Sequence, residues 1–405
     1  MNLSKIKSLL FAITGMFVAS VSVGQTWEIG YQTMTFVDAS RNNRQIETEL
    51  FYPADVTGYN VPLGTPSIQR YPVIVLGHDE AVAWNNYAYI WNRFATQGFI
   101  VAIPKTEMGV PMDVVEYAKD MAFVVSQFNV MRFTVGSFFF QRFNGKSCVM
   151  GHGVGGSAAT FALQYYPLIT TMVSLAAKET VPSAINAASL VTRPSVVIGG
   201  GKDCEAPIAT NQLPMFNNID SDCKTFINMF EATHCQFSQD FGSCANNMIN
   251  CLPSNKSWQF TTGNTNYLLI SFLRFYMKSN APALDKFEWK LGSKTVDWSY
   301  IFTCLQISPR IVSEDNSSEN TTTMNFYPNP VNAGSELNMV VASEESASAQ
   351  IIICNLMGQV VVQKEIPLEE SEQAVSIATD QIKSGYYMVT VINNEGRFTK
   401  PLIIQ

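Results

Sequence analysis

Two polar side chains, Asp203 and His234, have the types and the positions that acid–base chemistry requires. Asp203 comes just after the apolar run 195–199, and His234 comes just after the apolar run 225–230. An imidazole that is paired with a carboxylate can take a proton from a hydroxyl group or from water near neutral pH. We therefore predict that His234 donates a hydrogen bond to Asp203 and that the two residues form a general-base pair.

A glycine-dense turn lies where the nucleophile for such a base would be expected. The apolar residues 148–150 precede the turn, and a helix-forming run follows it. A strand, a sharp turn and a helix with the pattern G-x-S-x-G hold a serine hydroxyl above the edge of a sheet. Here Gly151 and Gly155 occupy the two glycine positions, and Gly153 stands in the place of the serine. The sequence thus predicts the backbone of a nucleophile elbow without its nucleophile.

The elements around these residues indicate the fold. Unbroken apolar runs are typical of strands that are buried on both faces of a parallel sheet. Strands that alternate with helices predict a mostly parallel α/β sheet covered by helices on both faces, with a site beyond the carboxyl ends of the strands. Residues 25–52 alternate between apolar and polar, as edge strands do. The expected buried strands are 71–77, 99–104, 148–150, 171–176, 195–199 and 225–230, and the expected helices are 87–96 and 113–128.

Composition excludes several classes of function. A hydrophobic content of 47% and a charged content of 15% describe a packed globular chain. The net charge is −7 and there is no basic run, so we expect no nucleic-acid partner. The spacing of the cysteines and histidines fits no metal site, and we expect neither a metal nor a cofactor. Beyond the N-terminus, no apolar stretch approaches the roughly 20 residues that span a bilayer.

Residues 1–25 have the composition of a signal peptide. Lys5 and Lys7 precede an apolar stretch, 9–23, that ends in small residues. In an exported chain the cysteines are candidates for disulfides. We expect Cys148 and Cys354 to be free, whereas the other six can pair in 15 ways that the sequence does not distinguish. Those six are Cys204, Cys223, Cys235, Cys244, Cys251 and Cys304.

The segments 72–78, 98–107, 149–156, 201–207 and 233–237 together resemble an α/β-hydrolase of the branch that includes dienelactone hydrolases, chlorophyllases and cutinase-like polyesterases. The resemblance implies that the domain spans 26–307 and that the family substrate is a small-molecule or polymeric carboxylic ester. It also implies catalytic positions at Gly153, Asp203 and His234, where Gly153 replaces the serine.

The same resemblance indicates where the oxyanion hole would lie. One N–H group would come from Val154, and another from the loop that follows residues 71–77. That loop reads His78, Asp79 and Glu80, and we expect Glu80 at the position usually held by an aromatic or apolar residue. A carboxylate beside a developing negative charge would oppose ester hydrolysis.

Residues 323–405 resemble the C-terminal sorting domain of the type IX secretion system of Bacteroidetes. The resemblance lies in residues 326–331, 351–361 and 384–391. Short alternating strands predict a small β-sandwich, and the Ser-, Asn- and Thr-rich stretch 308–322 has the composition of a linker. The implied partner is the secretion machinery, and the implied location is outside the cell or attached to its surface.

Two hypotheses of function remain open. In the first, the protein is a catalytically degenerate hydrolase that binds a ligand or partner at the cell surface. In the second, it is a true ester hydrolase, either inactivated by the change at Gly153 or using His234 and Asp203 to activate water. Because the nucleophile position is vacant, we predict that Gly153→Ser gives weak esterase activity on a small activated ester and that adding Glu80→Phe increases it.

Overall fold

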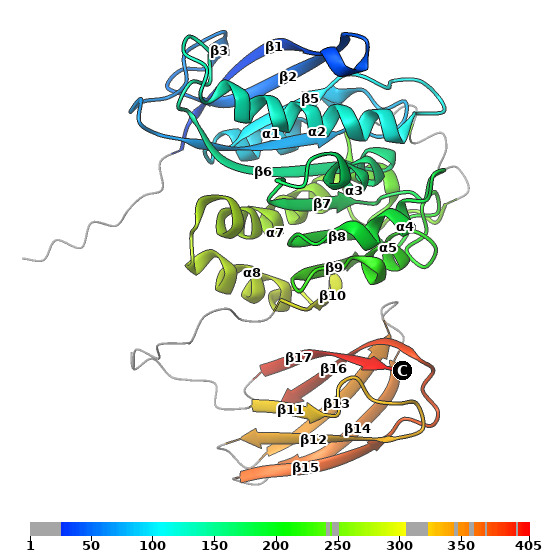
Figure 1. The fold of residues 1–405 in the computed structure, drawn as a ribbon. Helices are drawn as coiled ribbons and strands as arrows, with labels where there is room; N and C mark the ends of the chain where they lie inside the picture. Colours follow the sequence, from blue (N-terminus) through cyan, green and yellow to red (C-terminus); the bar gives the residue numbers. More distant parts are fainter. Residues whose placement is uncertain are drawn as a thin grey trace, which may run out of the picture.

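The computed structural model describes residues 26–239, 244, 251–304, 323–343, 347–355, 360–368, 371–393 and 396–405. The predicted signal peptide, 1–25, and the predicted linker, 308–322, lie outside the described residues. In Figure 1 the first part of the chain forms an α/β domain and the last part forms two small β-sheets. Within the residues that the structure describes, none of the helices is long and apolar enough to cross a membrane.

The α/β domain is built on a ten-stranded sheet with the order β10-β9-β8-β7-β6-β4-β5-β2-β1-β3. Neighbouring strands from β9 to β5 are parallel, whereas β10, β2 and β1 each pair antiparallel with a neighbour. The strands are β1 (Glu28–Asp38), β2 (Arg44–Ala54), β3 (Gly58–Tyr59), β4 (Tyr71–Gly77), β5 (Ile100–Pro104), β6 (Phe143–His152), β7 (Thr171–Leu175), β8 (Ser195–Gly200), β9 (Lys224–Met229) and β10 (Trp298–Phe302).

Helices cover both faces of this sheet, as the sequence predicted. The α-helices are α1 (Ala88–Ala95), α2 (Val114–Met131), α3 (Val154–Tyr165), α4 (Ala184–Ala187), α5 (Gln212–Asn218), α7 (Trp258–Lys278) and α8 (Pro282–Ser293), and the short 3-10 helices are η1 (Ala39–Arg41), η2 (Trp84–Tyr87), η3 (Ala188–Leu190) and η4 (His234–Phe237).

Two separate hydrophobic cores result. One core contains Val73 of β4 with residues of α2, α3 and α5. The other contains the next residue, Ile74, with residues of α1, α7 and α8. Successive side chains of a strand point to opposite faces, so an unbroken apolar run such as β4 supplies both cores at once. The predicted α/β fold class is therefore confirmed.

The C-terminal part forms two antiparallel sheets with the orders β11-β12-β15 and β14-β13-β16-β17. Their apolar faces share one core that includes Leu337, Ile351 and Val389. This is the predicted small β-sandwich. Its strands are β11 (Thr323–Tyr327), β12 (Glu336–Ser343), β13 (Ala347–Asn355), β14 (Val360–Leu368), β15 (Ser371–Ala378), β16 (Gly385–Asn393) and β17 (Gly396–Ile404).

Candidate active site

The predicted elbow is present between β6 and α3. Gly153 joins the two elements with φ 55° and ψ −123°, a conformation that glycine adopts readily and that strains other residues. The neighbouring glycines allow a close approach of two backbone segments, because a Cβ atom at Gly155 would overlap the main-chain oxygen atoms of Gly77 and His78. The elbow therefore has the tight geometry that would present a side chain at position 153.

The space above Gly153 is filled by the carboxylate of Asp79. A Cβ atom at position 153 would lie 2.5 Å from Oδ2 of Asp79 and closer still to its Cγ and Oδ1 atoms. Asp79 comes from the loop that follows β4, and its side chain is almost fully buried. A carboxylate thus occupies the position that a serine side chain would need.

Asp79 also takes the hydrogen bond of the expected oxyanion donor. The Val154 N–H group donates to Oδ1 of Asp79 at 2.7 Å. The other loop carboxylate, Glu80, accepts a hydrogen bond from the Met112 N–H group at 2.7 Å. Of the two carboxylates that sequence reasoning placed near the oxyanion hole, Asp79 is therefore the one that contacts Val154.

The structure brings Asp203 and His234 together at the carboxyl ends of β8 and β9. Nδ1 of His234 lies 2.7 Å from Oδ2 of Asp203, and Nε2 of His234 lies 3.1 Å from Oδ2 of Asp79. Oδ1 of Asp203 accepts hydrogen bonds from the N–H groups of Glu205 and Ala206 at 3.0 and 2.8 Å. The imidazole therefore lies between two carboxylates, and one of them stands where a nucleophile would be.

The charges of this cluster stabilise one another. Burial alone would lower the pKa of His234, but the carboxylates of Asp203 and Asp79 outweigh burial and raise that pKa to about 9. Burial alone would raise the pKa of Asp79, but the hydrogen bond and charge of His234, together with the charge of Lys178, hold that pKa well below its usual range. Nζ of Lys178 lies 3.2 Å from Oδ2 of Asp79 and 2.5 Å from Oε1 of Glu205. At neutral pH His234 is thus a cation and Asp79 an anion.

The remaining two histidines support the loop that carries Asp79. The Asp79 N–H group donates to the Tyr87 hydroxyl at 2.9 Å, and that hydroxyl lies 3.0 Å from Nδ1 of His152. Nε2 of His152 lies 3.0 Å from the main-chain oxygen of His234. Burial lowers the pKa of His152 to about 3, so this ring is neutral. The ring nitrogens of His78 lie 2.9 and 3.0 Å from the main-chain oxygens of Asp79 and Thr106.

Two clusters of potential metal ligands lie near this site, and neither favours a metal. Ligand atoms of Asp79, His152 and His234 lie within 4.8 Å of one another. The Nδ1 lone pair of His152 faces the Tyr87 hydroxyl, and its Nε2 faces a carbonyl oxygen, so the ring has no nitrogen left to bind an ion. The second cluster includes Cys235 and Cys244, which form a disulfide and offer no thiolate.

Disulfides fix the loops that carry the two residues of the pair. Cys204, next to Asp203, is bonded to Cys251, and Cys235, next to His234, is bonded to Cys244. A third disulfide joins Cys223 to Cys304, and none of the three disulfides includes Cys148 or Cys354. The six-cysteine prediction is confirmed, and the structure selects one of the 15 pairings.

The space in front of Asp79 is small and charged. A cavity of about 260 Å³ is lined by Asp79, Glu80, Ala81, Val82, Val110, Lys178, Glu205 and Cys244.

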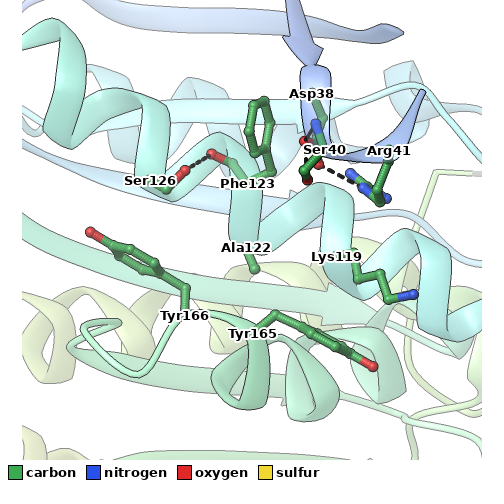
Figure 2. A pocket seen from close by; sticks show the side chains of 9 residues that line it. All are labelled: Asp38, Ser40, Arg41, Lys119, Ala122, Phe123, Ser126, Tyr165 and Tyr166. Carbon is green, nitrogen blue, oxygen red and sulfur yellow. Dashed lines mark hydrogen bonds and ion pairs between the residues drawn. The ribbon is translucent and has the colours of Figure 1, made fainter. Parts of the chain in front are cut away.

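A different cavity, of about 380 Å³, lies between η1, α2 and the end of α3, as Figure 2 shows. Its charged groups already have partners, because Asp38 binds Arg41 at 2.7 Å and the Lys119 ammonium binds Glu116 at 2.7 Å. We assign no function to this second cavity.

Sequence reasoning found the residues of the pair but missed what accompanies them. It noted Asp79 only as a carboxylate in the oxyanion loop, and it did not identify Lys178 or Tyr87. Lys178 lies just beyond the end of β7, which is the same sheet edge as Asp203 and His234. A search for polar residues at every strand end would have found it.

Comparison with known families agrees with this architecture. A model described as PET hydrolase-like matches residues 25–258, and a model described as a secretion system C-terminal sorting domain matches residues 325–405. A search of curated proteins found no match. The C-terminal match indicates export by the type IX secretion system to the cell surface or the extracellular space. This chain therefore belongs to the PET hydrolase-like family of α/β-hydrolases and carries a type IX sorting domain at its C-terminus.

Proposed function

We propose that this protein is a catalytically degenerate member of its family, a secreted binding protein whose former reaction centre has become a structural ion cluster. The observation that carries the proposal is the position of the Asp79 carboxylate. It fills the space of the nucleophile above Gly153 and accepts the hydrogen bond of Val154, the expected oxyanion donor. One carboxylate thus occupies two of the subsites that acyl transfer requires.

The protonation state of His234 supports the same conclusion. A general base must be unprotonated at the pH at which it works. With a pKa of about 9, His234 is protonated at neutral pH and donates hydrogen bonds to Asp203 and Asp79 instead of accepting a proton. Loss of the nucleophile alone costs on the order of a millionfold in rate in serine hydrolases, and the loss of a free base adds to it.

The alternative is a true hydrolase, and the contact between His234 and Asp79 is the observation that favours it. In that hypothesis Asp79, which lines the cavity, would be the carboxylate nucleophile. Attack on an ester carbonyl would then need an oxyanion donor, and the Val154 N–H group is already bonded to Oδ1 of the attacking residue. Water activation by His234 would require the imidazole to be neutral. The geometry therefore favours the degenerate protein.

The test combines a fluorophosphonate probe, which labels activated serines, with initial rates on p-nitrophenyl acetate. Four proteins are compared, namely wild type, Gly153→Ser, Asp79→Ala and the double variant. We expect no labelling and no turnover above background for wild type, and little for Gly153→Ser, because the new side chain overlaps Asp79. The sequence alone predicts weak activity for Gly153→Ser and an increase on adding Glu80→Phe, whereas the structure makes Asp79 the residue to replace.

The double variant should be labelled and should turn over the ester, since Asp79→Ala frees the Val154 N–H group and lowers the pKa of His234. Adding His234→Ala to the double variant is the matched control and should remove both signals. Ester hydrolysis by wild type that disappears in His234→Ala would overturn the proposal and support the true hydrolase.

A further inference from the structure

A groove lined with aromatic rings lies between the first strands of the sheet and helix α1, away from Asp79. Its volume is about 820 Å³, and it shares none of its lining residues with the cavity in front of Asp79. Six of the lining side chains are aromatic. One of them, Trp27, precedes β1, and the other five come from β1, β2, β3, η2 and α1. These five are Tyr31, Phe51, Tyr59, Trp84 and Trp91.

The strand register aligns three of these rings in one row. Tyr31 of β1 pairs with Tyr59 of β3 on one side and with Phe51 of β2 on the other. Ring centroids lie 5.8 Å apart for Tyr31 and Tyr59 and 6.5 Å apart for Tyr31 and Phe51. The row continues onto α1, where Trp91 stacks on Phe51 with a centroid distance of 4.3 Å and an interplanar angle of 5°. The side chains of Tyr31 and Tyr59 are 40% and 58% exposed, so ring surface is open to a ligand.

The polar groups of the groove include both hydrogen-bond acceptors and donors. Glu49 accepts hydrogen bonds from Thr33 at 3.0 Å and from Lys105 at 2.7 Å, and a carboxylate has lone pairs for further donors. Arg93 lines the groove and can only donate, whereas Asn85 can do both. Lys105 pairs with Glu47 as well as with Glu49, and the lining also contains Glu28 and Arg93, so the groove carries charges of both signs and no large net charge.

We propose that this groove binds an uncharged carbohydrate chain. A sugar ring offers an apolar face of C–H groups that packs against aromatic rings, and each of its hydroxyl groups both donates and accepts hydrogen bonds. The hydroxyl groups of such a ligand can donate hydrogen bonds to Glu49 and accept hydrogen bonds from Arg93. An ester polymer carries acceptors only and offers Glu49 no further donor. An organic cation would pair with the lining carboxylates but has no acceptor for the guanidinium group of Arg93. The proposal goes beyond the degenerate active site and does not depend on it.

The experiment is native affinity electrophoresis of the full chain in gels that contain hydroxyethylcellulose, xyloglucan, a soluble β-1,3-glucan or galactomannan. We expect at least one polysaccharide to retard wild type. The variant Tyr31→Ala/Tyr59→Ala should lower the association constant about tenfold, since each stacked ring contributes roughly a factor of three. Tyr31→Phe/Tyr59→Phe keeps the ring faces and should retain most of the binding.

The matched control is Tyr165→Ala. Tyr165 is 42% exposed, and it lies in the other cavity, shown in Figure 2. This variant should be retarded as strongly as wild type. Three results would overturn the proposal: no retardation of wild type by any of the four polysaccharides, equal retardation of wild type and the Tyr31→Ala/Tyr59→Ala variant, or calorimetric binding of bis(2-hydroxyethyl) terephthalate that is lost in that variant.

Discussion

The overlap between position 153 and Asp79 predicts a strong energetic coupling between these two residues. In Gly153→Ala the new Cβ atom must displace the Asp79 carboxylate, whose oxygen atoms lie 2.7 Å from the Val154 nitrogen, 3.1 Å from Nε2 of His234 and 3.2 Å from Nζ of Lys178. Breaking a buried ion pair by removing one partner costs about 3–5 kcal/mol. Alanine at a positive φ adds about 1–3 kcal/mol of backbone strain.

The expected cost of Gly153→Ala is therefore about 4–8 kcal/mol, a large part of the roughly 5–15 kcal/mol by which a folded domain is stable. In the Asp79→Ala background the carboxylate is already absent, and the same substitution should cost only the strain. The coupling free energy between the two substitutions should thus be about 3–5 kcal/mol.

Denaturant unfolding followed by tryptophan fluorescence measures this cycle. All six tryptophans lie between Trp27 and Trp298, so the signal reports on the α/β domain and not on the sorting domain. If Gly153→Ala is too unstable to purify, recovery of soluble protein in the Asp79→Ala/Gly153→Ala variant would show the same coupling qualitatively. Equal costs of Gly153→Ala in the two backgrounds, within about 0.5 kcal/mol, would refute the reasoning.

Three further predictions follow from the ion cluster, a disulfide and the sorting domain. The pKa of His234 rises from 6.5 to about 9 on folding, so its contribution of about 3 kcal/mol is complete below pH 6.5 and is lost as the pH rises through 9. Unfolding curves at pH 6.5 and 9.5 should show this loss in wild type and much less of it in His234→Gln. Cys204→Ser/Cys251→Ser should lower the free energy of unfolding by about 2–4 kcal/mol, since the bond closes a loop of 47 residues; unchanged stability would contradict the role given to this bond. Deletion of residues 323–405 should leave the fluorescence unfolding curve intact and should retain the protein in the periplasm of a host with type IX machinery, whereas undiminished export would contradict it.

The sequence predicts this fold well where a local pattern of residues is enough to determine the structure. The run Tyr71–Gly77 is a strand in both the prediction and the structure, because a short unbroken apolar run rich in Val, Ile and Leu favours a strand buried on both faces of a sheet. The order of Gly153, Asp203 and His234 along the chain likewise places them at one sheet edge, since parallel strands end on the same side. Spacing at strand ends is enough for these inferences.

Other features depend on contacts between distant parts of the chain. The sequence does not show that the loop after β4 turns Asp79, and not Glu80, toward Gly153, because this choice depends on the backbone direction at a single residue. It also does not show which cysteines pair, since Cys223 and Cys304 are 81 residues apart and meet only when β9 and β10 align. The strand β10 is not among the strands expected from the sequence, although its aromatic and branched residues favour a strand.

Asp79 and Gly153 each fit the structure only when the other residue is present. Glycine at 153 with a small residue at 79 would leave the buried Val154 N–H group without a partner, and a buried unpaired donor costs about 1–3 kcal/mol. Aspartate at 79 with a larger residue at 153 would produce the overlap described above. With both present, the carboxylate has three donors and two neighbouring cations, so its burial is compensated. A hydrolase that had merely lost its serine would keep an open, hydrated centre, whereas here the chain supplies its own anion at the position where a reaction would have created one.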